Sequence, residues 1–172
     1  KFVLGREMPF ALAGEWHGIS MLFPMEKLFE SYIAVHIKKL LNNSDYIVST
    51  QDKTHYLFEN SESRFWLKPD IVIKNDSTVF VMDTKWKLLS DTKANYGISQ
   101  GDMYQMFAYQ KKYTSENVTL LYPLTDKVVQ NKDINFLSYD GTEIKIRFID
   151  LFDLNHSIEI LLNELMTSLK SQ

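Results

Sequence analysis

Residues 68–86 read KPDIVIKNDSTVFVMDTKW and predict a β-hairpin. Two runs rich in β-branched residues, 70–74 and 78–86, are separated by Asn75-Asp76-Ser77, residue types that are typical of turns. Successive side chains of a strand point to opposite faces, so Asp83 and Lys85 share one face, about 6.6 Å apart. The second run is apolar enough for an inner strand, where charged side chains are rare without a function.

The register of this hairpin decides where Asp70 lies. If Lys74 pairs with Val79, Asp70 lies opposite Asp83, and pairing of Lys74 with Ser77 moves it by one step along the same face. Both loops contain an even number of residues, whereas an odd loop places Asp70 on the other face. The even loops therefore bring two carboxylates and a lysine together.

Two carboxylates and a lysine at the ends of strands suit Mg²⁺-dependent phosphodiester hydrolysis. Hard oxygen ligands hold the hard cation, which polarises the phosphate and lowers the pKa of a water molecule. A nearby lysine can orient the attacking water and offset the charge that develops on the phosphate oxygens. The alternative is structural, because an Asp and a Lys two residues apart on a strand are usually a surface ion pair and Pro-Asp usually forms a turn.

A first helix is predicted from Pro24 to the pair Asn42-Asn43. Its apolar stripe at helical spacing comprises Leu28, Phe29, Tyr32, Ile33, His36, Ile37 and Leu40. Glu26 and Glu30 share a face of this helix, and Glu30 lies at the edge of the stripe. A carboxylate there could complete a metal site; the alternative is a solvated acidic pair near the helix N-terminus.

A second helix is predicted from Ser99, an N-cap with Asp102 in the capping-box position, to about Tyr113. Gln105 and Tyr109 are four residues apart and therefore neighbours on one face. These side chains can bind phosphate oxygens or orient a lysine or a water molecule. The alternative is an ordinary amphipathic helix whose tyrosine is half in the core.

The remaining segments complete a mixed α/β pattern. Short strands are predicted at 46–50, 56–58, 64–67 and 117–122, a second hairpin at 133–139 and 143–150, and a final helix from about residue 155. Their order predicts a mixed sheet that is flanked by helices. Residues 1–20 are predicted to be a connecting segment left from a longer chain, because the sequence does not begin with methionine.

Composition excludes several classes of protein. The 172 residues favour one domain, and an apolar content of 45% argues against disorder. The absence of cysteine excludes disulfide scaffolds and thiolate chemistry. No apolar run approaches the length of a membrane span, and we expect a cytoplasmic protein. The net charge of −3 excludes a generally basic surface, so contact with DNA would need a local rim of lysines, for which the candidates are Lys38, Lys39, Lys68, Lys74, Lys85, Lys87, Lys111 and Lys112.

The motif residues resemble a known group of nucleases. Lys68-Pro69-Asp70, Asp83-Thr84-Lys85 and Gln105-x-x-x-Tyr109 together are similar to the PD-(D/E)XK nuclease superfamily, and the last motif to its RecB-like branch. Four longer phrases resemble the McrC family, and they are FPMEKLFE (23–30), DTKWK (83–87), DMYQMFAY (102–109) and LLYP (120–123). The resemblance covers residues 21–123.

This resemblance implies a restriction-endonuclease-like nuclease domain over residues 21–172, with a central mixed sheet flanked by helices. It implies that Asp70, Asp83 and Lys85 are catalytic, that Gln105 and Tyr109 support them, and that Glu30 and the backbone carbonyl of Thr84 join the two aspartates as metal ligands. The implied cofactor is Mg²⁺, with Mn²⁺ as a substitute.

The implied function is the DNA-cleaving, nuclease subunit of a GTP-dependent McrBC-like restriction system that acts on DNA with modified cytosine. The implied partners are DNA, an McrB-like AAA+ GTPase and, for double-strand cleavage, a transient second copy of the chain. Two alternatives remain. One is a RecB-like DNA repair nuclease without a GTPase partner, and the other is a catalytically silent nuclease-fold module that serves assembly.

Overall fold

The computed structural model describes residues 24–59, 64–115, 117–126 and 133–167. The connecting segment predicted at residues 1–20 lies outside the described residues. Among those described, no helix combines the length and the apolar character that a membrane crossing requires.

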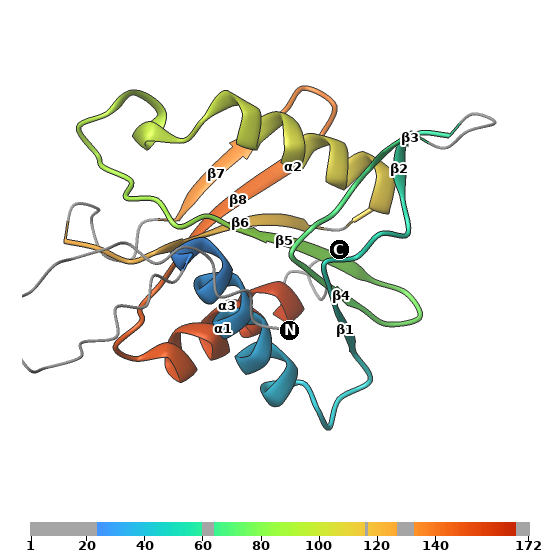
Figure 1. The fold of residues 1–172 in the computed structure, drawn as a ribbon, viewed down its shortest axis with the longest axis horizontal. Coiled ribbons are helices and arrows are strands. Elements are labelled where there is room, and N and C mark those ends of the chain that lie inside the picture. The colour runs from blue at the N-terminus through green and yellow to red at the C-terminus, as the bar shows by residue number, and fades with distance from the viewer. Residues whose placement is uncertain (1–23, 60–63, 116, 127–132, 168–172) are drawn as a thin grey trace, which may run out of the picture.

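A six-stranded mixed sheet forms the centre of the molecule (Figure 1). In spatial order its strands are β1 (Ile47–Thr50), β4 (Ile71–Lys74), β5 (Val79–Thr84), β6 (Asn117–Pro123), β8 (Glu143–Ile149) and β7 (Ile134–Leu137). The pairs β5–β6 and β6–β8 are parallel, and the other three are antiparallel. A separate two-stranded sheet joins β2 (Tyr56–Phe58) to β3 (Arg64–Trp66). The predicted mixed sheet is therefore confirmed.

Helices cover both faces of the central sheet. Figure 1 shows α1 (Met25–Leu40) and α3 (Leu154–Thr167) on one face and α2 (Gln100–Tyr113) on the other. The strand pattern explains this arrangement, because inner strands with apolar residues on both faces need cover on both sides. β5 and β6 are of this kind, since nearly every side chain along them is buried.

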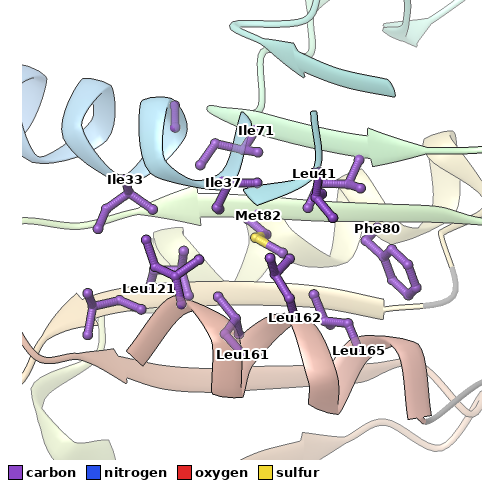
Figure 2. Packing of buried hydrophobic residues seen from close by; sticks show 14 of the residues in the cluster. Ile33, Ile37, Leu41, Ile71, Phe80, Met82, Leu121, Leu161, Leu162 and Leu165 are labelled. Atoms are coloured by element: carbon purple, nitrogen blue, oxygen red, sulfur yellow. The ribbon is translucent and has the colours of Figure 1, made fainter. Parts of the chain in front are cut away.

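The alternation of side chains along β4 and β5 divides the core into two clusters. Ile71, Ile73, Phe80 and Met82 pack against α1 and α3, as Figure 2 shows for several of them. Val72 and Val81, at the intervening positions, pack in the second cluster together with residues of α2. Asp70 and Asp83 have the same parity as these two valines, so the alternation directs them to the face that α2 covers.

The apolar stripe predicted on α1 was too broad. The buried residues of this helix are Phe29, Glu30, Ile33, Ala34 and Ile37. Leu28, Tyr32 and Leu40, which the spacing placed in the stripe, are 50%, 45% and 38% exposed. The reason is geometric: α1 packs on one side only, so a narrow face of the helix meets the sheet and α3.

Local signals at the ends of elements agree with the structure in most places. The Oγ atom of Ser99 accepts a hydrogen bond from the backbone N–H of Asp102, which confirms the predicted cap of α2. Gly141 has a φ of +83° in the predicted turn between β7 and β8. Pro24 proves to be the N-cap of α1 rather than its first helical residue. A short turn, η1 (Ala94–Gly97), lies between β5 and α2, and its residues Asn95 and Tyr96 have φ angles of +49° and +57°.

Candidate active site

The β4–β5 register brings the two predicted aspartates together. Lys74 pairs with Val79 and Ile71 with Met82, which is the first of the two registers considered from the sequence. The ladder ends at this last pair, and extending its register by one step places Asp70 opposite Asp83. This pairing explains why the charge of Asp70 acts strongly on the Asp83 carboxyl.

An open cavity of about 450 Å³ lies over this pair. Six elements or their adjoining loops contribute to its wall: α1, the end of β1, the segment before β4, the end of β5, the loop after β5 and α2. The lining residues are Glu26, Lys27, Glu30, Gln51, Lys68, Asp70, Asp83, Thr84, Lys85, Trp86, Lys87, Asp102 and Gln105. All but one of the predicted site residues therefore line a single cavity, and the exception, Tyr109, contacts Gln105.

Both carboxylate oxygens of Asp70 accept hydrogen bonds from the protein. Its Oδ2 atom accepts from the backbone N–H and from the hydroxyl of Thr84, each at 2.8 Å. Its Oδ1 atom accepts from Nε2 of Gln51, also at 2.8 Å. These contacts fix the orientation of the carboxylate before any ligand binds. They also show Thr84 acting through its N–H and hydroxyl, whereas its backbone carbonyl as a metal ligand stays a prediction.

Asp83 is buried and poorly satisfied. The residue is 3% exposed, and its Oδ2 atom lies 2.5 Å from Nζ of Lys85 without the angular geometry of a hydrogen bond. Burial and the nearby charge of Asp70 raise the pKa of Asp83 to about 6, although Lys85 acts to lower it. Oδ2 of Asp83 thus has a close contact with the Lys85 ammonium, and a cation bound to this carboxylate would relieve its repulsion from Asp70.

Lys85 is held by polar groups from two elements. Its Nζ atom lies 3.0 Å from Oε1 of Gln105 and 3.7 Å from Oδ1 of Asp102, in addition to its contact with Asp83. Burial acts to lower the pKa of Lys85, but the surrounding carboxylates Asp83, Asp102 and Asp70 raise it above its ordinary value. Lys85 is therefore a fixed positive charge at neutral pH.

Gln105 and Tyr109 on α2 form a short chain of hydrogen bonds that ends at Lys85. Nε2 of Gln105 donates to the hydroxyl of Tyr109 at 2.7 Å, while Oε1 of Gln105 accepts from Lys85. Tyr109 is buried, and burial together with the charge of Asp83 raises its pKa, so its hydroxyl stays protonated. The two residues thus contact the predicted catalytic lysine directly or through one intermediate, as their spacing on the helix predicted.

Glu30 reaches the cavity from α1 but is separated from the aspartate pair. It is 8% exposed, accepts from Nζ of Lys27 at 2.7 Å, and also accepts from Nε2 of Gln51. Within the described ranges, no three His, Asp or Glu side chains lie close enough together to hold one ion. Glu30 as a metal ligand therefore stays a prediction, while its solvated alternative is wrong because the side chain is buried.

The donor set of the aspartate pair fits Mg²⁺. This ion commonly uses one or two carboxylates and retains several water molecules, so a third carboxylate is not required. Asp70 is oriented by Thr84, and the close contact of Asp83 is with the Lys85 ammonium. The cavity is open, which leaves room for water and for a phosphate.

Sequence reasoning missed two residues of the site. Gln51 contacts Glu30 and Asp70 from the end of β1, and Lys27 pairs with Glu30 on α1. Lys27 could have been found from its spacing of three residues from Glu30. The position of Gln51 depends on the β1–β4 register, in which Thr50 pairs with Ile71, and no local pattern encodes that pairing.

Only three of the eight lysines predicted to form a basic rim line the cavity. Lys68, Lys85 and Lys87 line the cavity. The other five candidates do not line it: Lys38 and Lys39 lie in the last turn of α1, Lys74 ends β4, and Lys111 and Lys112 lie in the last turn of α2. The helix dipole favours lysines in the last turn of a helix, which explains the positions of the four candidates on α1 and α2.

Comparison with solved structures finds a related fold. The chain is similar to a chain in the tetradecameric assembly of Thermococcus gammatolerans McrB AAA+ hexamers with bound McrC, with a TM-score of 0.63 and 18% identity. The match covers 82% of this chain and 33% of that chain, so this chain spans about a third of its length. No curated protein matches the sequence.

Comparison with protein families gives a more specific result. The model described as McrBC 5-methylcytosine restriction system component matches residues 1–123, which include the aspartate pair, Lys85 and the polar residues of α2. The match spans well over half of the chain. The chain therefore belongs to the family of McrBC 5-methylcytosine restriction system components.

Proposed function

We propose that this chain is a Mg²⁺-dependent endodeoxyribonuclease of the PD-(D/E)XK type, the DNA-cleaving component of a GTP-dependent system that restricts DNA with modified cytosine. The observation that carries the proposal is the β4–β5 register, which sets Asp70 opposite Asp83 with Lys85 at the same edge of the sheet. Membership in the McrBC family supports it.

In this proposal each residue of the cavity has a defined task. Asp70 and Asp83 hold the cation, and Thr84 keeps the Asp70 carboxylate oriented. A bound Mg²⁺ supplies Lewis-acid polarisation of the phosphate and favours ionisation of a water nucleophile. Lys85, which is cationic at neutral pH, offsets negative charge that develops on the phosphate oxygens. Gln105 and Tyr109 hold the ammonium group of Lys85 in place.

The family match favours a restriction nuclease over the two alternatives considered from the sequence. A repair nuclease that works without a GTPase is disfavoured by the match to restriction components. A catalytically silent module is disfavoured by the complete set of two aspartates and a lysine around one cavity. We propose an McrB-like AAA+ GTPase as the protein partner, because the similar solved chain belongs to an assembly of McrB with bound McrC.

A plasmid-nicking assay tests the proposal. Supercoiled plasmid with methylated cytosine is incubated with the chain and Mg²⁺, Mn²⁺ or EDTA, with and without the co-encoded GTPase and GTP. We expect cleavage only with a divalent cation, and we expect the GTPase to stimulate it on methylated DNA. A second preparation carries a fused coiled coil that dimerises the chain. It tests whether double-strand cleavage needs two copies.

Matched variants of the same hairpin give the control. Asp70→Asn and Asp83→Asn should abolish cleavage, because each removes a charged metal ligand. Asp76→Asn changes an exposed aspartate in the β4–β5 turn, at the opposite end of the hairpin, and should cleave like the wild type. Equal cleavage by Asp83→Asn and the wild type would exclude this site as the origin of the activity.

A further inference from the structure

Gln51 occupies the space between two carboxylates of the cavity. Its Nε2 atom donates to Oε1 of Glu30 and to Oδ1 of Asp70, the latter at 2.8 Å. A carboxamide NH₂ has two hydrogens, so both donors of this group are used on acidic side chains. A neutral group thus bridges two negative charges at a point where a cation would be attracted to both.

The backbone holds Gln51 at this point. Gln51 follows β1, and its N–H donates to the carbonyl oxygen of Asp70 at 3.0 Å, which extends the β1–β4 ladder by one step. Its φ is +51°, in the left-handed region that disfavours residues other than glycine. Glycine or asparagine would adopt this φ with less strain. Glycine has no side chain, however, and that of asparagine is too short to reach both carboxylates.

We infer that Gln51 is a displaceable placeholder for the divalent cation, an inference that rests on the proposed function. Its amide hydrogens use carboxylate lone pairs that a cation would also use, and hydrogens carrying partial positive charge cannot face the ion. A cation that takes the Oδ1 lone pair facing Glu30 must therefore displace the Nε2 group from Asp70. Thr84 holds the other oxygen of Asp70, so the carboxylate keeps its orientation while the carboxamide moves away.

This competition makes a prediction that a purely structural role does not. If Gln51 competes with the cation, its removal frees a ligand oxygen and tightens cation binding. If Gln51 only clamps the fold, its removal lowers stability without changing affinity. If the side chain turns over and offers its Oε1 atom to the ion, removal weakens binding. The sign of the change in affinity therefore separates the three roles.

The test is calorimetric titration of the whole chain with Mn²⁺, the probe ion, in the absence of DNA. Gln51→Met keeps the length of the side chain without its amide, and Gln51→Gly removes the side chain while suiting the positive φ. We expect both to bind Mn²⁺ roughly tenfold more tightly than the wild type, equivalent to about 1.4 kcal/mol. Thr114→Gly is the matched control, since Thr114 has a φ of +47° at the end of α2 and lies outside the cavity.

Further measurements make each outcome decisive. Melting curves in EDTA show that the variants fold, and Gln51→Gly gives the answer if Gln51→Met does not. Unchanged or weaker Mn²⁺ binding by both folded Gln51 variants would overturn the placeholder role. Failure of the proposed function has a different signature, in which the wild type binds no Mn²⁺ or Asp83→Asn binds it as tightly as the wild type does.

Discussion

The Asp83 carboxylate is destabilising in the metal-free protein at neutral pH. It is buried beside Asp70, and its contact with Lys85 offsets only part of the resulting penalty, so that its pKa rises to about 6. A carboxyl whose folded-state pKa exceeds its unfolded value stabilises the fold at low pH and loses that contribution as the pH rises. Sites that gather like charges for a ligand commonly sacrifice stability in this way.

The first prediction is that Asp83→Asn stabilises the metal-free chain at pH 7.5 but not near pH 4. Asparagine resembles the protonated carboxyl. The variant should therefore keep the stability that the wild type loses as Asp83 ionises between about pH 4 and pH 7. The gain should be up to about 3 kcal/mol, because the pKa moves from 3.8 to about 6. Urea unfolding in EDTA at both pH values measures it. Lower stability of Asp83→Asn at pH 7.5 would mean that the ion pair with Lys85 dominates.

The second prediction separates positioning residues from metal ligands. Gln105→Ala removes the acceptor that holds Nζ of Lys85 and should slow single-turnover cleavage roughly 5- to 150-fold, which corresponds to about 1–3 kcal/mol. Asp70→Ala should show no cleavage. Rates are measured with the GTPase partner present. Tyr109→Phe keeps the buried ring and loses only the hydroxyl that accepts from Gln105, so its effect should be smaller.

Two results would contradict the positioning role of Gln105. Wild-type rates for Gln105→Ala would show that α2 merely packs against the sheet. The mutation should also leave the Mn²⁺ affinity near the wild-type value, because Gln105 contacts Lys85 and Tyr109 rather than the aspartate pair. A large loss of Mn²⁺ binding would instead assign Gln105 to the metal site.

At the scale of elements, a cluster of charges joins β8 to α3. Arg147 makes a bidentate contact with Glu164, with Nε at 2.7 Å and Nη2 at 2.5 Å from its two oxygens, and Nζ of Lys145 lies 3.3 Å away. Burial acts to raise the pKa of Glu164, but the two cations lower it below its ordinary value. The cluster thus connects the helix to the edge of the sheet that lies far from β1.

The third prediction concerns Glu164→Gln, which removes the carboxylate that Arg147 and Lys145 share, while Arg147 keeps its longer contact with Asp133 at 3.8 Å. The variant should lose about 1–3 kcal/mol of stability at pH 7. A carboxyl with a lowered pKa stabilises above its unfolded pKa and loses that contribution as the pH falls, so the difference should shrink below about pH 4. Chemical unfolding at pH 7 and at pH 3.5 measures this. Glu159→Gln, exposed on the same helix, is the control and should be neutral.

For the whole molecule, the balance of charge bears on the proposed binding of DNA. The net charge is −3, and the cavity is lined by five carboxylates and four lysines. The chain belongs to a family of restriction system components, and we propose that it binds DNA together with an McrB-like partner. A cation at the aspartate pair would reverse the local balance and favour phosphate.

The fourth prediction is that a divalent cation strengthens DNA binding by the chain. A fluorescent duplex should bind at least about tenfold more tightly in Ca²⁺ than in EDTA, because neutralising buried carboxylates removes repulsion of the phosphate. Fluorescence anisotropy at low salt measures the affinity, which should fall as salt rises. The double variant Asp70→Asn, Asp83→Asn should lose the Ca²⁺ effect. Equal wild-type affinity in Ca²⁺ and EDTA would contradict the prediction.

Local patterns in the sequence were enough to predict the helices, the strands and the pairing of β4 with β5. Turn residues between two β-branched runs predicted the hairpin, and a loop with an even number of residues was enough to direct Asp70 to the side of Asp83. Ser99 predicted the start of α2, which put Gln105 and Tyr109 on one helical face. Such signals lie within a few residues of one another, so the chemistry of turns, caps and periodicity encodes them locally.

The set of side chains that share the cavity depends on how distant segments pack together. Gln51 meets Asp70 and Glu30, which are 19 and 21 residues away, through the β1–β4 register and the docking of α1. Leu28 and Tyr32 fit the apolar period of α1 but stay exposed, because one face of that helix suffices to cover the sheet. Contacts between distant segments depend on register and packing, which are properties of the assembled fold and are encoded by no single stretch of sequence.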